Sequence, residues 1–258
     1  MRSIALLNQK GGVGKTTTTA NLGACLAMLG KKVLVIDMDP QANLSVHLGV
    51  DIHSLKHSVY DIIRGACKPD GVILNTRTHG LDIIPSNIDL SGAEIELVGV
   101  VGRETILKEY LGDVLYRYDY VLVDCPPSLG LLTLNVLTLV DEIFIPLQTE
   151  FFALQGVSKL LDTHEVVRKR LNSNLEISGI IFCMYTSRTR LCKEVIEKVK
   201  EYFAEDQVFK TVIRKNVKLS ESPSHGKPIV SYAPDSHGSE DYMSLAKEVV
   251  QQENKKKH

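Results

Sequence analysis

The sequence has little of what marks secreted or membrane proteins. Its five cysteines are an odd number in 258 residues and include no C-x-x-C pair, so we expect reduced thiols in a cytosolic protein. Only four apolar residues follow Ser3, which is too short an apolar segment for a signal peptide. The longest nearly apolar run, Leu129 to Val140, has 12 residues, whereas a membrane span needs about 20. We therefore expect a cytoplasmic protein with no membrane partner.

Net charge is also nearly absent. The chain holds 30 Lys and Arg against 31 Asp and Glu, a formal net charge of −1, which by itself does not suggest a nucleic-acid partner. The two parts of the chain differ, however. Residues 1–150 hold 12 cations and 17 anions, a balance of −5, and residues 151–258 hold 18 and 14, a balance of +4. Such a split indicates a basic surface in the second part.

The basic excess is concentrated between residues 168 and 218. Carboxylates are interleaved there at helical i,i+4 spacing, so the pattern alone leaves a solvated helix and a DNA-binding surface equally open. The cations are Arg168, Lys169, Arg170, Arg188, Arg190, Lys193, Lys198, Lys200, Lys210, Arg214, Lys215 and Lys218.

Short β-rich apolar runs alternate with longer segments of helical period. The predicted strands are Ile4–Leu7, Val33–Ile36, Leu81–Ile84, Tyr120–Val123, Glu142–Leu147, Ile177–Met184 and Val208–Ile213. The predicted helices are Lys15–Leu29, Ser58–Arg64, Leu90–Tyr116, Leu129–Val140, Leu154–Leu171, Leu191–Phe203 and Ser239–Gln252. Several strands are continuously apolar, as in a parallel sheet that is buried on both faces. We expect one doubly wound α/β domain over residues 1–250, with a mostly parallel sheet and helices on both faces, and a polar tail at 251–258 that frays.

A glycine-rich loop, NQKGGVGKTT, follows the first predicted strand and leads into a predicted helix. Its glycines permit the backbone conformations that turn successive N–H groups inward, forming an anion-binding nest at a helix N-terminus. Lys15 is expected to reach the β- and γ-phosphates, and the Thr16 hydroxyl is expected to bind Mg²⁺. The expected nucleotide contacts in the loop are Lys10, Gly11, Gly12, Val13, Gly14, Lys15, Thr16 and Thr17.

The loop departs from the common form G-x-x-x-x-G-K-[ST], because Gln9 stands at the first glycine position. A Rossmann dinucleotide loop fits less well, since Lys15 to Thr17 stand where its third glycine belongs. Lys10 is an additional lysine ahead of the glycines. An ammonium at the loop's edge can neutralise phosphate charge on a second molecule's nucleotide, as an arginine finger does. The alternative is an ordinary solvated lysine.

Carboxylates follow two of the predicted strands. Asp37 and Asp39 leave the second strand on the same side, and Asp124 ends the strand at 120–123. Ligand chemistry in α/β sheets collects at the carboxyl ends of strands. We expect Asp124 to hold Mg²⁺ through water. A strand-terminating turn is the alternative explanation for the segment 37–40.

These motifs together resemble one family. KGGVGKTT at 10–17, DMDPQAN at 37–43 and VLVDCPPSLG at 121–130 are similar to the deviant Walker ATPases, and among them to the ParA/Soj chromosome and plasmid partition ATPases. The resemblance continues through SGAEIEL, MYTSRTRL and NVKLSESPSHGKPI, so it covers nearly the whole chain. It implies a P-loop ATPase domain that uses ATP and Mg²⁺ as a homodimer. In it Asp39 orients or deprotonates the attacking water, Asp37 supports the Mg²⁺ shell and Lys10 crosses the dimer interface.

The resemblance also implies a DNA partner. Arg188 and Lys218 match positions that contact non-specific double-stranded DNA, and Arg190 adds a charge to the same patch. Lys218 stands in place of a more usual Arg and lacks its bidentate fork. Asn216 matches the loop that contacts the adenine base, although Arg214 stands where the family commonly has Pro. A ParB-like partner would accelerate hydrolysis, and the protein would be associated with the nucleoid.

Other functions stay open alongside partition. A MinD-like division-site regulator needs a C-terminal amphipathic helix, which residues 251–258 do not provide. An ATPase that positions another cargo would share all the chemistry, and a metabolic P-loop enzyme would need an acceptor pocket for a small molecule. Cys125 is expected to be a buried inert thiol rather than an iron-sulfur ligand. His53 and His57 are expected at the surface rather than on zinc.

Overall fold

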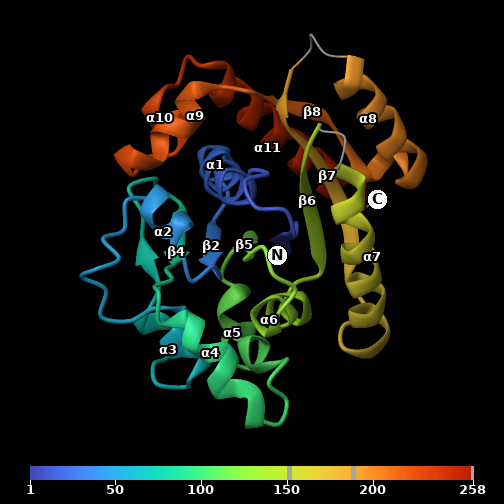
Figure 1. Cartoon of the computed structure of the whole chain (residues 1–258). Helices are drawn as coiled ribbons and strands as arrows, with labels where there is room; N and C mark the ends of the chain where they lie inside the picture. Colours follow the sequence, from blue (N-terminus) through green and yellow to red (C-terminus); the bar gives the residue numbers. More distant parts are fainter. Residues whose placement is uncertain (150–152, 187–189, 257–258) are drawn as a thin grey trace.

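The computed structural model describes residues 1–149, 153–186 and 190–256, without the side chains of 153–156, 190, 191, 193, 255 and 256. The described strands form one sheet of eight in the order β3-β4-β2-β5-β1-β6-β7-β8 (Figure 1). Neighbouring strands are parallel except for the antiparallel pair β3 and β4. The strands are β1 (Arg2–Leu6), β2 (Val33–Asp37), β3 (Leu74–Asn75), β4 (Leu81–Ile84), β5 (Tyr120–Asp124), β6 (Glu142–Gln148), β7 (Glu176–Tyr185) and β8 (Val208–Arg214).

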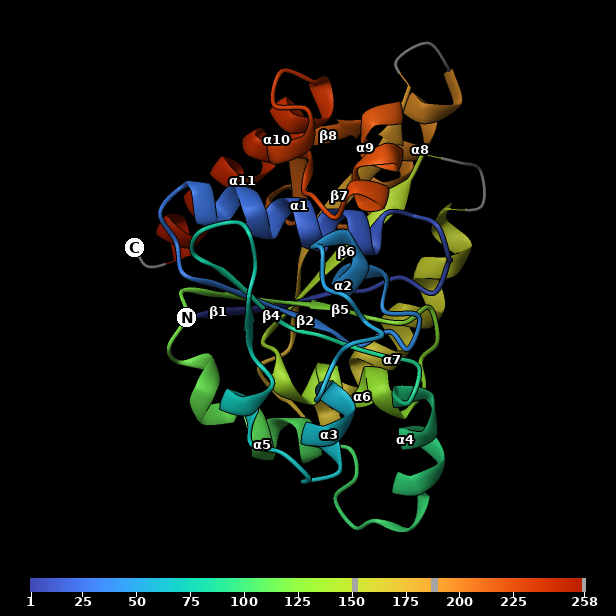
Figure 2. The same cartoon turned by 90° about the vertical axis from the view of Figure 1, so that its left-hand side faces the viewer.

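Helices cover both faces of the sheet, with α1 and α11 on one face and α3, α5 and α6 on the other (Figure 2). The longer helices are α1 (Lys15–Met28), α4 (Leu90–Glu96), α5 (Ile106–Leu115), α6 (Leu131–Leu139), α7 (Ala153–Arg170), α8 (Arg190–Tyr202) and α11 (His237–Lys256). The short ones are α2 (Asn43–His47), α3 (Val59–Ile63), α9 (Val217–Glu221) and α10 (Ile229–Tyr232). The 3₁₀ turns are η1 (Pro69–Gly71), η2 (Leu97–Gly99), η3 (Glu205–Gln207) and η4 (Ser222–His225).

The central strands β1, β2 and β5 consist entirely of buried residues. Their side chains alternate between two apolar cores, one under α3 to α8 and one under α1, α2, α10 and α11. Because both sheet faces are covered, each of these strands contains a continuous largely apolar run, at 4–6, 33–36 and 120–123, rather than an alternating pattern. The prediction of a doubly wound, mostly parallel α/β fold is confirmed.

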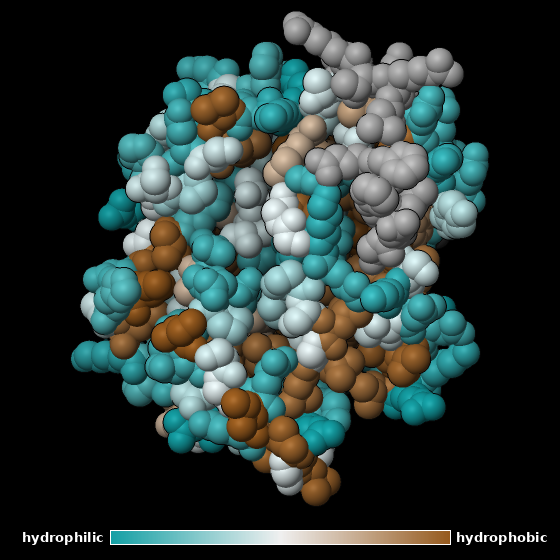
Figure 3. All heavy atoms as spheres, viewed as in Figure 1, coloured by the Kyte–Doolittle hydropathy of each residue, from teal (hydrophilic) through white to brown (hydrophobic). Residues whose placement is uncertain are grey.

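The prediction of one helix over 90–116 is wrong. The chain forms α4, the turn η2 and an irregular segment before α5 begins at Ile106. Gly102 has a φ of 74°, a left-handed conformation that an α-helix does not contain. Apolar side chains gather over this region (Figure 3), and Ile95, Val98 and Val101 are 78%, 64% and 99% exposed. The apolar residues at helical spacing in this segment therefore do not form one buried helix face.

The helices α2, α9 and α10 and the two-residue strand β3 had no counterpart among the predicted elements. These elements have only two to five residues each, which leaves little hydrophobic period to recognise.

The last helix passes the residue at which the tail was expected to fray, since α11 continues to Lys256. Gln252 anchors it: its Nε2 donates to Ser178 O at 2.8 Å, and its Oε1 accepts from Arg2 Nη2 at 2.6 Å. Among the described helices, none is long and apolar enough to cross a membrane.

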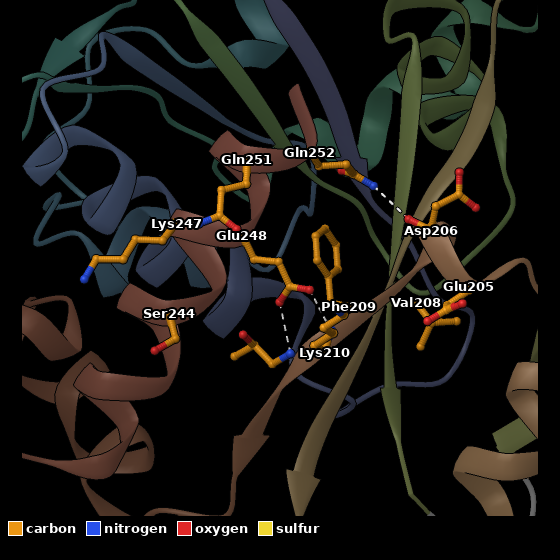
Figure 4. Close-up of a pocket in the computed structure, with 11 residues that line it drawn as sticks. Glu205, Asp206, Val208, Phe209, Lys210, Ser244, Lys247, Glu248, Gln251 and Gln252 are labelled. Carbon is orange, nitrogen blue, oxygen red and sulfur yellow. Dashed lines mark hydrogen bonds between the residues drawn. The ribbon is translucent and has the colours of Figure 1, made fainter. Parts of the chain in front are cut away.

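The same helix covers the free edge of β8. The Glu248 carboxylate accepts the backbone N–H groups of Lys210 and Thr211 at 2.7 and 3.0 Å (Figure 4). Asp241 accepts the N–H of Arg214 at 2.9 Å. These carboxylates occupy donors that an edge strand otherwise offers to another chain.

Candidate nucleotide-binding site

The glycine-rich loop joins β1 to α1 at the carboxyl edge of the sheet. Gly12 and Gly14 have φ values of 74° and 99°, which are left-handed conformations. A Cβ on Gly12 would meet nothing within 4 Å, so at that position the backbone conformation, rather than crowding, favours glycine. Helix α1 begins at Lys15 with no side-chain cap and no acidic residue in its first turn. Its first N–H groups are therefore left for an anion, as the sequence predicted.

An open cavity of about 580 Å³ lies over this loop. Its walls come from the loop, from the segment after β2, from α2, and from the end of β7 and the turn η4. The lining residues are Gly11, Gly12, Gly14, Lys15, Thr16, Thr17, Asp39, Gln41, Asn43, Val46, His47, Pro127, Met184, Pro223 and Ser224. Most of the predicted loop contacts thus face one cavity together with Asp39.

Lys15 is the buried cation of the site, only 7% exposed. Burial lowers the pKa of its ammonium, and the charge of Asp124 opposes that shift. Its Nζ lies 3.4 Å from the carbonyl oxygen of Lys10. A partly desolvated ammonium within an anion-binding loop is suited to a polyanionic ligand.

Asp37 and Asp124 meet at the carboxyl edge as register partners on β2 and β5, and both are fully buried. Burial raises the pKa of Asp37 to about 6, although the Ser45 hydroxyl and N–H donate to its carboxylate at 2.7 and 2.9 Å. Burial, and then the charge of Asp37, raises the pKa of Asp124 well above its ordinary value. Thr16 Oγ1 donates to Asp124 Oδ2 at 2.6 Å.

These groups fit a magnesium ion. Two buried carboxylates with raised pKa values indicate negative charge without a full counter-charge, and the Thr16 hydroxyl adds an oxygen ligand beside Asp124. The described side chains include no cluster of three His, Cys, Asp or Glu that would bind a metal ion by itself. Mg²⁺ is commonly bound by one or two carboxylates together with substrate phosphates and water.

Asp39 lines the cavity and is half-buried. Its Oδ1 accepts the N–H of Gln41 at 2.9 Å, and its own N–H donates to Asp37 Oδ1 at 3.2 Å. Ala42 follows with a φ of 53°, a left-handed conformation that favours glycine. The segment 37–42 is therefore fixed by its own hydrogen bonds next to the phosphate loop.

Lys10 is exposed at the edge of the loop, and its Nζ donates to Gln148 Oε1 at 3.1 Å. It is not among the residues that line the cavity. Its role across a dimer interface stays a prediction.

The remaining predicted residues lie away from the cavity or outside the described residues. Lys218 is exposed on α9, with its Nζ 2.9 Å from Glu221 Oε2. Asn216 caps α9, and its Oδ1 accepts the N–H of Lys218 at 2.8 Å. Arg190 begins α8, and its side chain is not described; Arg188 lies outside the described residues. The structure does not bring Asn216 into the cavity wall.

Several cavity residues had no predicted role. Met184, Pro223 and Ser224 lie within the motifs MYTSRTRL and NVKLSESPSHGKPI. The motifs therefore pointed to these segments, but the sequence assigned no function to these three residues. Ser45 and Gln148 had no sequence signal, because each contact depends on the folded loops. Cys125 is fully buried and burial raises the pKa of its thiol, in agreement with the predicted inert cysteine.

A phosphate loop between β1 and α1, with strand-end carboxylates facing its Thr16, defines a P-loop nucleoside triphosphatase. Comparisons with known proteins agree. Residues 1–177 match the AAA domain family. Soj of Bacillus subtilis, a sporulation initiation inhibitor protein, is 53% identical over 247 residues, covering 96% of this chain and 97% of Soj. The chromosome-partitioning ATPase Soj of Treponema pallidum is 50% identical, with 96% of this chain and 97% of that protein covered.

A solved structure gives the same result for the fold. Cobyrinic acid a,c-diamide synthase of Mycobacterium smegmatis, crystallised with ADP and magnesium, superposes with a TM-score of 0.86 at 36% identity. The match covers 98% of this chain and 95% of that chain. By its sequence relatives, the chain belongs to the Soj/ParA family of chromosome-partitioning ATPases.

Proposed function

We propose that this protein is an ATPase that partitions DNA, with residues 1–250 as its catalytic domain. The observation that carries the proposal is the pairing of the phosphate loop with Asp124 and Asp37 at the carboxyl edge of the sheet. Full-length similarity to partition ATPases supports the cellular role. ATP and Mg²⁺ are the substrate and cofactor, in keeping with relatives solved with ADP or an ATP analogue and magnesium.

In this proposal the loop residues 10–17 bind the phosphates, with Lys15 neutralising them and Thr16 beside the ion. Asp124 and Asp37 hold the magnesium shell, and Mg²⁺ when bound neutralises charge on the phosphate oxygens. Asp39 orients the attacking water or takes its proton. The half-buried Asp39 carboxylate lies in the cavity wall with one oxygen already hydrogen-bonded to the backbone, which restricts its orientation.

Two protomers are proposed to enclose two ATP molecules, with Lys10 reaching the partner's nucleotide. The resulting dimer binds double-stranded DNA without sequence preference through Arg188, Arg190 and Lys218, and associates with the nucleoid. A monomer offers few phosphate contacts, whereas a dimer on one duplex doubles them, so ATP binding switches DNA affinity. A ParB-like partner accelerates hydrolysis and thereby releases the DNA. Asn216 is proposed near the adenine through its loop.

The proposal is tested first by hydrolysis. Lys15→Ala should abolish nucleotide binding, because the buried counter-charge for the phosphates is lost. Asp39→Ala should bind ATP and dimerise but not hydrolyse it, measured by phosphate release and by light scattering with ATP. Normal hydrolysis by the Asp39 variant would show that its assignment is wrong.

The same preparation distinguishes the other functions. Sedimentation with liposomes and ATP separates a MinD-like membrane protein from a DNA-bound one. Product analysis that finds a phosphorylated small molecule besides ADP and phosphate would favour a metabolic enzyme. An ATPase that positions another cargo would behave identically in both assays and differ in its adaptor protein.

A further inference from the structure

The predicted DNA contact Lys218 is paired within its own protomer. Its Nζ lies 2.9 Å from Glu221 Oε2, three residues further along α9, and 5.8 Å from the centre of the Tyr232 ring on α10. Within the described part of the chain, these two groups are the partners of the ammonium. Helices α9 and α10 lie side by side (Figure 1), so the contact joins two elements.

Tyr232 holds the carboxylate that meets Lys218. Its hydroxyl donates to the same oxygen, Glu221 Oε2, at 2.9 Å. The ring stands at the end of α10, which is anchored by the buried side chains of Ile229 and Val230. The hydrogen bond from Lys218, and then that from Tyr232, lowers the pKa of Glu221, so its carboxylate is ionised at neutral pH. The contact is therefore an ion pair of defined geometry rather than a chance meeting of two mobile side chains.

An ionised carboxylate at this place acts against a phosphate ligand. Together Lys218 and Glu221 carry no net charge, and the carboxylate repels a phosphate that approaches the ammonium. We propose that Glu221 sets the affinity of the DNA interface, because it competes with DNA phosphate for Lys218 and so weakens binding. This rests on the proposed DNA contact of Lys218. A weak contact makes one protomer bind poorly, whereas two copies on one duplex add their free energies, so DNA binding depends on the dimer.

The exposure of the pair sets the size of the effect. The side chains of Lys218 and Glu221 are 52% and 40% exposed, so water screens their attraction. An exposed pair of this kind changes an equilibrium by up to about fivefold. In a dimer on one duplex both copies contribute, so the two effects multiply to up to about 25-fold.

Three substitutions separate the pair from the general effect of charge. Glu221→Gln removes the charge and keeps both the side-chain length and an acceptor oxygen for Tyr232. Asp235→Asn is the matched control, because it removes the same charge from an exposed position three residues after Tyr232. Lys218→Gln, alone and combined with Glu221→Gln, completes a double-mutant cycle that isolates the interaction between the two side chains.

The measurement is the affinity for a labelled DNA duplex by fluorescence anisotropy, with a non-hydrolysable ATP analogue and Mg²⁺ present. We expect Glu221→Gln to bind DNA about fourfold to 25-fold more tightly than the parent protein, and Asp235→Asn to stay within about twofold. In the Lys218→Gln background the gain from Glu221→Gln should disappear. A gain that persists there, an equal gain from Asp235→Asn, or a loss of affinity in Glu221→Gln would overturn the role of Glu221.

Nucleotide affinity is the second readout, because Glu221 directly precedes the turn η4, whose Pro223 and Ser224 line the nucleotide cavity. A fluorescent ATP analogue should bind Glu221→Gln and the parent protein with affinities within about twofold of each other. A change in nucleotide affinity that accounts for the whole change in DNA binding would place the effect in the cavity wall and refute the competition. If Lys218→Gln binds DNA as tightly as the parent, the DNA contact in the proposed function fails, and the role of Glu221 fails with it.

Discussion

Asp37 and Asp124 are register partners on β2 and β5, 0% exposed, and come from segments 87 positions apart in the chain. Neighbouring buried carboxylates repel each other when both are ionised, and each loses hydration. The site therefore carries a cost in the free protein that a bound cation would relieve. Thr16 and Ser45 offset part of it by donating to Asp124 and Asp37.

The cost makes stability depend on pH. The pKa of Asp37 is raised from 3.8 to about 6, so the folded state binds more protons than the unfolded state between these values. Stability from this group is then highest at low pH and falls as pH rises toward 6. We expect Asp37→Asn to raise the free energy of unfolding by up to about 3 kcal/mol near pH 7.5, and by only about 1 kcal/mol near pH 4.5.

Urea unfolding of the nucleotide-free, magnesium-free protein at the two pH values measures this difference. Asp113→Asn, at an exposed position on α5, is the matched control and should change little at either pH. A gain from Asp37→Asn that is the same at both pH values would contradict the raised pKa as its cause.

DNA affinity should depend steeply on salt. For the ATP-bound protein, the slope of log affinity against log salt should be near −0.9 for each contacted phosphate, and Arg188→Ala should reduce its magnitude by about 0.9 for each protomer that loses the contact. Fluorescence anisotropy with duplexes of two unrelated sequences gives the slope and tests non-specific binding together. Lys32→Ala removes an exposed cation at the amino ends of the strands and should leave the slope unchanged. An unchanged slope for Arg188→Ala removes that residue from the interface.

A glycine in β7 should not tolerate a methyl group. A Cβ on Gly179 would lie 2.5 Å from Phe144 and 2.6 Å from Phe209, two buried rings in edge-to-face contact. Gly179→Ala should therefore lower the free energy of unfolding by about 1–3 kcal/mol through overpacking. Gly112→Ala in α5 meets nothing within 4 Å and should instead raise it by about 0.5–1 kcal/mol. Thermal denaturation of both variants checks the opposite signs.

The protected edge of β8 gives another expectation. Glu248→Ala leaves the N–H groups of Lys210 and Thr211 without their carboxylate, which should cost about 1–3 kcal/mol of stability and increase self-association. Glu248→Gln keeps an acceptor oxygen and should lose less. Size-exclusion chromatography at rising protein concentration follows the association, and equal behaviour of the two variants would contradict a role of the acceptor.

Much of the fold follows from local pattern. The seven predicted strands correspond to β1, β2, β4, β5, β6, β7 and β8, because buried strands of a parallel sheet contain short, continuous apolar runs that the sequence shows directly. The segment 90–116 was mispredicted, because its apolar residues at helical spacing are in part exposed. A helical period shows that apolar residues recur at regular spacing, but it does not show whether another helix or the sheet covers them.

The sequence by itself determined the phosphate loop and the carboxylates, because strand, glycines, Lys15 and Thr16 are adjacent in the chain and act through backbone geometry and spacing. Only the tertiary structure decided which distant groups meet there. The order of the strands puts Asp37 beside Asp124, and the ends of β6 and β7 bring Gln148 and Met184 to the loop. Such contacts join residues far apart in sequence, and the packing of the whole sheet fixes them.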